Sequence, residues 1–197
     1  MTDVEYFYTL SSPWAYFAGP QISEMAKRLG VRFIHKPFDF IEVVPKTGGI
    51  PLRTRPQPRQ AYHAVELDRW RKYLNMPLNL KPRYYPTNNK PAGHMVIATQ
   101  LRGLDPQPLA FALLRALWGE ERDISAPNVR REIANDVGLD GAALLDAETA
   151  PETLAAYQAN SDRCIDVGVF GSPTFVLKGE LFWGQDRLTF LERAIAR

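Results

Sequence analysis

Residues 4–18 of the chain are VEYFYTLSSPWAYFA, and the interpretation of the remaining sequence starts from this stretch. Alternating β-branched and aromatic residues in its first half predict a buried strand. The strand stops at Ser11-Ser12-Pro13, where a serine followed by proline at the first helical position indicates the start of a helix. Free backbone N–H groups and the positive end of a helix dipole then meet at one place, which favours an anion. Ser12 stands at this place, either as an N-cap alone or as a ligand-binding residue.

The composition is that of an ordinary globular protein. The chain has 197 residues, of which 45% are hydrophobic and 23% charged, enough for a substantial core. Lys and Arg exceed Asp and Glu by only 24 to 22, which argues against a nucleic-acid partner. No apolar run resembles a signal peptide or a membrane span, so we expect a cytoplasmic protein without a membrane partner.

Cysteine and histidine usage restricts the chemistry further. The single cysteine, Cys164, excludes an intrachain disulfide and a cysteine-based metal cluster, and we assign it no chemistry. The three histidines, His35, His63 and His94, are scattered without a metal-binding spacing, so we expect no metal site. We interpret His35 and His94 as structural residues.

The first half of the chain continues with a helix and a second strand. Apolar residues at helical spacing predict a helix from Pro13 to Gly30, which we expect to be kinked or to restart near Pro20. Residues 31–37 predict a strand parallel to the first. The proline-rich stretch 46–59 predicts a loop, and a helix is expected from Ala61 onward.

Strand signals return only near the C-terminus. Residues 61–167 predict helices and no strand, with an irregular Pro- and Asn-rich stretch at 78–90, whereas 174–177 and 180–183 predict a hairpin. Asp186 is the expected N-cap of a last helix. Together the two ends predict an α/β fold, a thioredoxin-like four-stranded mixed sheet with an all-helical insertion. We predict a discontinuous thioredoxin-like domain, 1–45 and 165–197, and a helical insertion domain, 46–164.

Two segments of this fold form the predicted site. Thioredoxin-like redox proteins carry Cys-x-x-Cys after the first strand, but here the tetrapeptide is Ser12-Pro-Trp-Ala15. The protein itself therefore cannot perform thiol–disulfide exchange at this turn. Pro173 precedes the hairpin, and in this fold context we expect a cis Ser172–Pro173 bond. The backbone of Ser172 could then pair with an extended, peptide-like ligand.

Four motifs resemble one enzyme family. They are SPWAY at 12–16, ALWGEERDI at 116–124, FGSPTF at 170–175 and FWGQDRL at 182–188. In this order, and over essentially the whole chain, they resemble the 2-hydroxychromene-2-carboxylate isomerase family. That family is similar to kappa-class glutathione transferases and more distantly to DsbA-like oxidoreductases. The resemblance implies glutathione as cofactor, a small aromatic carboxylate as substrate, a role in aromatic hydrocarbon catabolism, and a homodimer.

The resemblance also implies roles for individual residues. The Ser12 hydroxyl would donate to the glutathione sulfur, the Ser172–Pro173 backbone would hold the cysteinyl part, and the turn at 185–186 would hold the γ-glutamyl end. The implied set is Ser12 as catalytic residue, with Ser12, Pro13, Trp14, Ser172, Pro173, Gln185 and Asp186 as glutathione-binding residues. Asp186 could instead serve only as a helix cap, or have both roles, and Trp14 can equally pack under the inserted helices.

The carboxylates of substrate and glutathione need cations, and the proline-rich loop offers several. Its basic residues are Lys46, Arg53, Arg55 and Arg59, each of which can also be a solvated surface charge. The family often has an asparagine in this loop where this chain has Gly49, and Asn88 and Asn89 are possible replacements or turn residues. As substrate-binding residues we predict Lys46, which is the first choice among the cations, together with Arg59 and Asn89.

Three functions remain open at this point. The first is isomerisation between 2-hydroxychromene-2-carboxylate and trans-o-hydroxybenzylidenepyruvate, or a related compound, by reversible addition of the glutathione thiolate. The second is irreversible conjugation of glutathione to electrophiles, as in kappa-class transferases. The third is a thioredoxin-fold module without redox activity that binds ligands without turnover.

Overall fold

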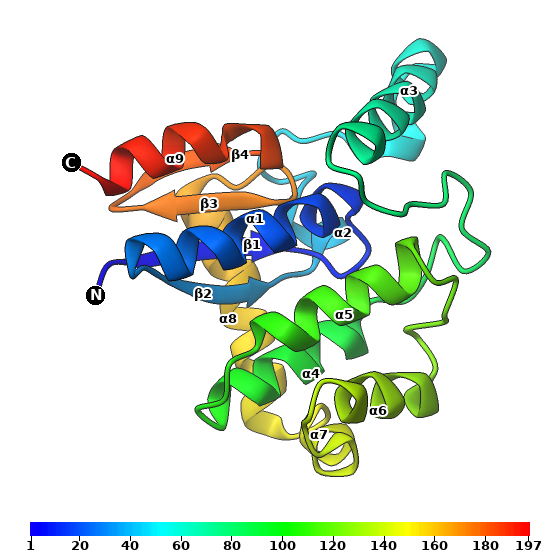
Figure 1. The fold of residues 1–197 in the computed structure, drawn as a ribbon, viewed down its shortest axis with the longest axis vertical. Helices are drawn as coiled ribbons and strands as arrows, with labels where there is room; N and C mark the ends of the chain where they lie inside the picture. Colours follow the sequence, from blue (N-terminus) through cyan, green and yellow to red (C-terminus); the bar gives the residue numbers. More distant parts are fainter.

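A four-stranded sheet with the strand order β2-β1-β3-β4 forms the centre of the computed structural model, which describes residues 1–197 (Figure 1). β1 (Asp3–Tyr8) is parallel to β2 (Arg32–Pro37) and antiparallel to β3 (Thr174–Leu177). β4 (Glu180–Trp183) pairs antiparallel with β3 as a hairpin. The predicted thioredoxin-like mixed sheet is therefore confirmed.

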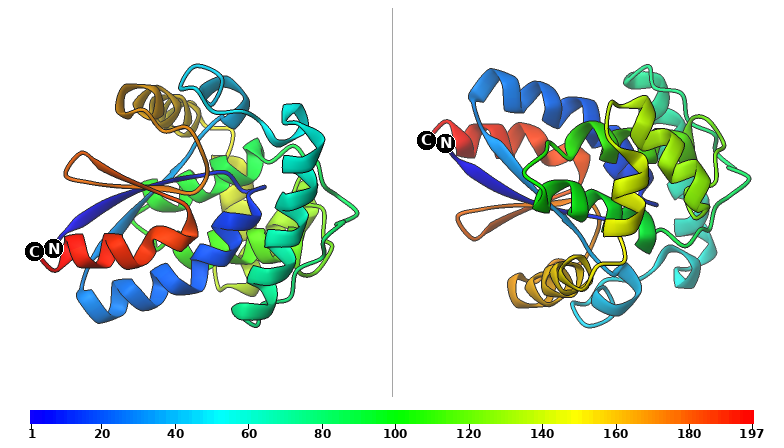
Figure 2. Two further views of the ribbon diagram at one scale, coloured as in Figure 1. Left: turned by 90° about the horizontal axis from the view of Figure 1, so that it is seen from above. Right: turned by 90° about the horizontal axis from the view of Figure 1, so that it is seen from below.

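Helices cover both faces of this sheet. Figure 2 shows α1 and α9 on one face, α2 and α8 on the other, and the two chain ends side by side. None of the helices combines the length and the hydrophobicity that a membrane span requires. The helices are α1 (Pro13–Leu29), α2 (Phe40–Val43), α3 (Gln57–Tyr73), α4 (Lys90–Leu101), α5 (Gln107–Trp118), α6 (Pro127–Asp136), α7 (Gly141–Ala147), α8 (Pro151–Val167) and α9 (Leu188–Ile195), with 3-10 turns η1 (Leu52–Thr54) and η2 (Gln185–Arg187).

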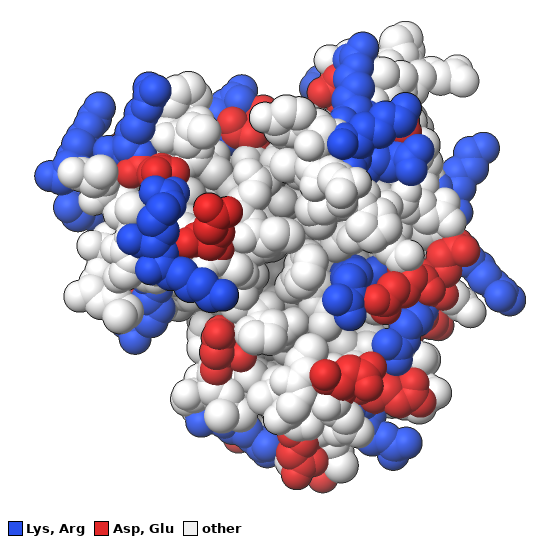
Figure 3. All heavy atoms as spheres, viewed as in Figure 1, with Lys and Arg blue, Asp and Glu red and all other residues white.

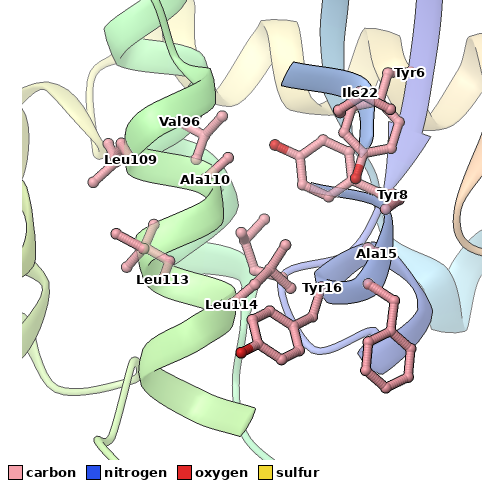
Figure 4. Close-up of a cluster of buried hydrophobic side chains, with 14 of the residues drawn as sticks. Tyr6, Tyr8, Ala15, Tyr16, Ile22, Val96, Leu109, Ala110, Leu113 and Leu114 are labelled. Carbon is pink, nitrogen blue, oxygen red and sulfur yellow. The ribbon is translucent and has the colours of Figure 1, made fainter. Parts of the chain in front are cut away.

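One large core joins the sheet to helices from the first half and the middle of the chain. Tyr6 and Tyr8 of β1 belong to a cluster of 34 buried residues, which also takes in α1, α4 and α5. Figure 4 shows Leu114 of α5 packed toward Tyr16 of α1 and the β1 tyrosines. Phe7 points to the opposite face and belongs to a second, smaller cluster. The alternation of side chains expected for β1 is thus observed, and both faces of this strand are buried.

The predicted domain boundary falls inside one helix. Residues 164 and 165 both lie in α8, and Cys164 packs under the sheet with Phe7 and Val176. Residues 151–164 of α8 belong to the predicted insertion and residues 165–167 to the predicted sheet domain. The division of the chain into two domains therefore stays a prediction.

Two helices contain prolines at places where the sequence predicted a break or a loop. α1 runs from Pro13 to Leu29 as one helix, so the possible restart near Pro20 does not occur. α3 begins at Gln57 rather than Ala61, with Pro58 in its first turn. Proline is tolerated there because the first N–H groups of a helix have no intrahelical partner. The predicted loop at 46–59 is therefore shorter than expected, and η1 interrupts it.

α4 protects the outer edge of the sheet at His35. The side-chain amide of Gln100 accepts a hydrogen bond from the backbone N–H of His35 (2.9 Å) and donates one to its carbonyl (3.3 Å). The Tyr8 hydroxyl is hydrogen-bonded to Nδ1 of His35 at 2.9 Å. Both backbone groups of His35 in this edge strand are therefore satisfied by Gln100 of α4, as expected for a protected sheet edge.

Because His35 is buried, the stability of the native protein should decrease as the pH falls. Burial lowers the pKa of His35 to about 3. The unfolded chain, with an ordinary histidine pKa of about 6.5, binds the proton first as pH falls, so native stability decreases. Between pH 7 and pH 5 we expect a loss of roughly 2 kcal/mol from this residue.

Denaturant unfolding at a series of pH values measures this loss. His35→Gln should flatten most of the slope between pH 7 and 5, whereas His94→Gln, at a half-buried position, should flatten less of it. An unchanged slope in the His35 variant would contradict the assignment.

Candidate active site at the start of helix α1

The Ser12 hydroxyl connects the start of α1 to the segment before β3. Ser12 has an extended backbone, and its Oγ accepts a hydrogen bond from the Ala15 N–H at 3.2 Å, which confirms the predicted N-cap. The same Oγ donates to the Ser172 carbonyl at 3.1 Å. Only 7% of Ser12 is exposed, and the first turn of α1 carries no acidic residue. The positive end of the helix dipole is therefore not neutralised at this place.

The Ser172–Pro173 segment lies beside this turn, as predicted. The peptide bond between the two residues is cis. Ser172 Oγ accepts from the Thr9 N–H at 3.0 Å, and the Pro173 carbonyl accepts from the Gly184 N–H at 2.9 Å. Three segments far apart in the sequence, at residues 9–15, 172–173 and 184, are therefore joined by hydrogen bonds.

Gln185 and Asp186 follow directly after Gly184. Gln185 is buried; its Oε1 accepts from Gln21 at 2.9 Å, but its Nε2 has no hydrogen-bond partner. Asp186 is exposed and pairs with Arg187 at 2.6 Å. The expectation that Asp186 caps the last helix is wrong. Residues 185–187 form η2, and α9 begins only at Leu188 without a side-chain cap.

His63 is a site residue that the sequence did not reveal. Trp14, in the first turn of α1, donates its indole N–H to His63 Nε2 at 3.1 Å, and the two rings meet edge to face. Trp14 thus lies beside the Ser12 turn and also contacts α3. Burial, followed by the positive charge of Arg55, lowers the pKa of His63. A signal was available, because His63 lies four and seven residues before Leu67 and Trp70, on the inward face of α3.

The basic residues of the loop differ in their partners. Lys46 is exposed and pairs with Glu42 at 3.1 Å, so its charge is already compensated. Arg55 donates its Nε to the Ile50 carbonyl at 2.8 Å but has no carboxylate partner. Burial, followed by the charge of Arg59, lowers the pKa of Arg55. Arg59 lies exposed in the first turn of α3.

No acidic residue balances these arginines locally. The sequence contains no Asp or Glu between Val43 and Val65. In Figure 3, Lys and Arg side chains gather over α3, while the middle of the same face, over α1 and α5, is nearly free of charge. A half-buried guanidinium next to a like charge is electrostatically unfavourable, and an anion would relieve it.

Asn89 is also close to the Ser12 turn. Its side-chain amide donates to Ser11 Oγ at 3.1 Å, although the residue lies 78 positions further along the chain. Asn88 instead accepts from the Lys90 N–H at 3.3 Å, as in an ordinary turn. Gly49 has no room for the asparagine that the related family often carries. A Cβ at this position would overlap the Phe170 carbonyl and a methyl group of Val44.

Comparison with known proteins identifies the family. The model of the DSBA-like thioredoxin domain matches residues 3–196. The chain belongs to this family. It is 29% identical to the 2-hydroxychromene-2-carboxylate isomerase of Sphingobium xenophagum over 192 residues, which cover 96% of this chain and 95% of that protein. It is 26% identical to the isomerase of the same name from Pseudomonas putida, with 98% and 94% covered.

Solved structures show the same relationship. A 2-hydroxychromene-2-carboxylate isomerase superimposes with a TM-score of 0.81 at 26% identity, with 99% of this chain and 95% of that chain covered. The cytosolic disulfide reductase DsbM from Pseudomonas aeruginosa with GSH superimposes with a TM-score of 0.71 at 20% identity, with 99% and 100% covered. At that identity the second similarity concerns the fold alone.

Proposed function

We propose that this protein is a glutathione-dependent isomerase. It would interconvert 2-hydroxychromene-2-carboxylate and trans-o-hydroxybenzylidenepyruvate, or a related intermediate of aromatic degradation. The relatives of that name align over nearly the whole chain. The observation that carries the proposal is the Ser12 hydroxyl, which lies at the start of α1 within 3.1 Å of the Ser172 carbonyl. A cytoplasmic homodimer is part of the same proposal.

The groups at the site fit a tripeptide thiol. The Ser172 carbonyl is an acceptor for a peptide N–H, and the Ser12 hydroxyl and the start of α1 suit a thiolate. The Gln185 amide is a buried donor without a partner, which suits a carboxylate of the γ-glutamyl end. The Asp186 carboxylate, if it releases Arg187, can pair with the ammonium group of that end.

When bound, glutathione would supply a thiolate that adds reversibly to the conjugated system, so that a carbon–carbon double bond becomes a rotatable single bond. Ser12 acts in this scheme as a hydrogen-bond donor and not as the nucleophile. In the structure the Ser12 hydroxyl donates its one proton to the Ser172 carbonyl. It must therefore rotate before it can donate to the sulfur. A ligand N–H can take the vacated place on that carbonyl.

The helix start and the Ser12 hydroxyl both favour the thiolate form. A free thiol of pKa about 8.5 is only about 3% ionised at pH 7. Lowering this pKa by about 2 units, or roughly 2.7 kcal/mol, makes thiolate the major form. Pro13 supports this role because it fixes the first helical position without using a backbone N–H.

Arg55 and Arg59 are the proposed partners of the substrate carboxylate. Neither is bonded to an acidic side chain, and the surrounding stretch contains none. Lys46 and Asn89 stay candidates for the same substrate. Asn89 is the better placed of the two because it contacts the residue next to Ser12, whereas Lys46 already has Glu42 as partner.

A spectrophotometric assay tests the proposed function. A hydroxychromene carboxylate is added with and without glutathione, and the approach to equilibrium is followed from both directions. Equilibration without loss of free thiol supports the isomerase. Stoichiometric loss of thiol would instead indicate a transferase of the kappa-class type, which can use the same turn. Absence of any reaction in both directions would indicate a binding module.

Ser12→Ala should raise the pKa of bound glutathione by about 1–2 units, because the sulfur loses its hydroxyl donor. The ultraviolet absorbance of the thiolate, followed as a function of pH, measures this change. The variant should also lose about 1 kcal/mol of stability with the N-cap. Asp140→Ala is the matched control, since it removes the N-cap of α7 and leaves the site intact. Equal thiolate titrations in wild type and Ser12→Ala would contradict the proposed role.

Arg55→Met should raise KM for the carboxylate substrate about 10-fold or more, with a smaller effect on kcat, because a charge-assisted hydrogen bond is lost. Steady-state kinetics of the isomerisation measure both constants. Arg102→Met is the control, an exposed arginine without an acidic partner at the end of α4. If Lys46→Met raises KM and Arg55→Met does not, the carboxylate binds at Lys46 instead.

A further inference from the structure

The bond between Trp14 and His63 fixes which nitrogen of the imidazole carries the proton. An indole N–H can only donate, so His63 Nε2, 3.1 Å from it, must be an unprotonated acceptor. The proton of the neutral ring therefore resides on Nδ1. No group of the protein accepts a hydrogen bond from this Nδ1, and Nδ1 is not one of the buried polar atoms that lack a partner. It is thus an oriented donor that no group of the protein uses and that is not completely enclosed.

Three features keep this imidazole neutral. A protonated ring would lose the bond from Trp14, because both of its nitrogens would be donors. Burial and the nearby charge of Arg55 both lower the pKa of His63. The acidic residue closest along α3, Glu66, bonds to Arg69 instead. A neutral histidine held in this way is suited to donate a hydrogen bond to a developing negative charge.

The other two histidines lack this combination. His35 is fully enclosed, and its Nδ1 is hydrogen-bonded to Tyr8. His94 contacts the ring of Tyr157 edge to face and makes no side-chain hydrogen bond to an indole. Only His63 has its tautomer set by a residue in the first turn of α1, two positions from Ser12.

We propose that His63 is a further catalytic residue, whose Nδ1–H donates to the ketone oxygen of an α,β-unsaturated 2-oxo acid. This inference rests on the proposed function. When a nucleophile bonds to the β-carbon of such a substrate, the π pair of the double bond shifts and the ketone oxygen becomes an enolate oxygen. When the nucleophile leaves, the pair returns and the double bond forms again. His63 stabilises the charge and keeps its proton, so no proton needs to be returned.

The test uses trans-benzylidenepyruvate, the enone without the ortho hydroxyl, first in the absence of glutathione. A hydrogen bond to the ketone oxygen shifts the enone absorption to longer wavelength. We expect this shift in the wild type and in His94→Phe, the matched control at the other half-buried histidine. The shift should be absent in His63→Phe and partly present in His63→Gln, whose amide can still accept from Trp14 and donate to the ligand.

The second measurement is turnover of the full protein with glutathione. His63→Phe should lower kcat by about 10²–10³-fold, as for loss of one oxyanion donor, with the glutathione Kd from calorimetry unchanged. An unchanged glutathione Kd also shows that the variant is folded at the site. A retained spectral shift, or a kcat within threefold of wild type in His63→Phe, would overturn the role of His63. If the wild type shows the shift but neither binds nor uses glutathione, the proposed function fails and His63 stands as a ligand-binding donor.

Discussion

The hydrogen bond from Ser12 to the Ser172 carbonyl is the contact on which the arrangement of the site depends. It joins the start of the first helix to the segment before the hairpin, 160 residues later in the chain. The Thr9 N–H and Ser172 Oγ form a second link between the same segments, and Gly184 adds the turn at 185–186 through the Pro173 carbonyl. A dipole end, a hydroxyl and the backbone carbonyl that accepts from it are therefore held together before any ligand binds, which reduces the entropy cost of binding.

The turn lies at the start of α1, whereas the stretch that follows α2 supplies groups that the turn lacks. The turn has no cation and no histidine; Arg55, Arg59 and His63 all come from the stretch between α2 and the middle of α3. α3 has only one buried residue, Leu67, so hydrophobic burial contributes little to its position. The bond from Trp14 to His63 is thus a specific link between α3 and the turn. Because α3 has so little buried surface, it is suited to close over a ligand.

Local signals in the sequence predicted the elements that carry the site, and non-local contacts explain what was missed. The strand before Ser12, the N-cap and the hairpin after Pro173 have short-range signatures, so each was predicted correctly. The sequence predicts the start of α3 four residues too late, because Pro56 and Pro58 are typical of a loop as well as of a helix start. Asp186 has the residue type of an N-cap, but the 3-10 turn of 185–187 delays the start of the helix by one residue. His63 was missed because its partner, Trp14, lies 49 residues away.

The location of the one cysteine decides where a reactive sulfur must come from. Cys164 is fully buried in one cluster with Phe7 and Val176, and burial raises the pKa of its thiol. A buried, protonated thiol is a poor nucleophile, so the chain has no reactive sulfur of its own. The position that carries the first cysteine in redox thioredoxin folds is Ser12, which keeps the helix dipole and a donor but has no sulfur. Any thiol chemistry at this turn must therefore use a sulfur that arrives with a ligand, and the same geometry that activates a protein thiolate would then activate a bound one.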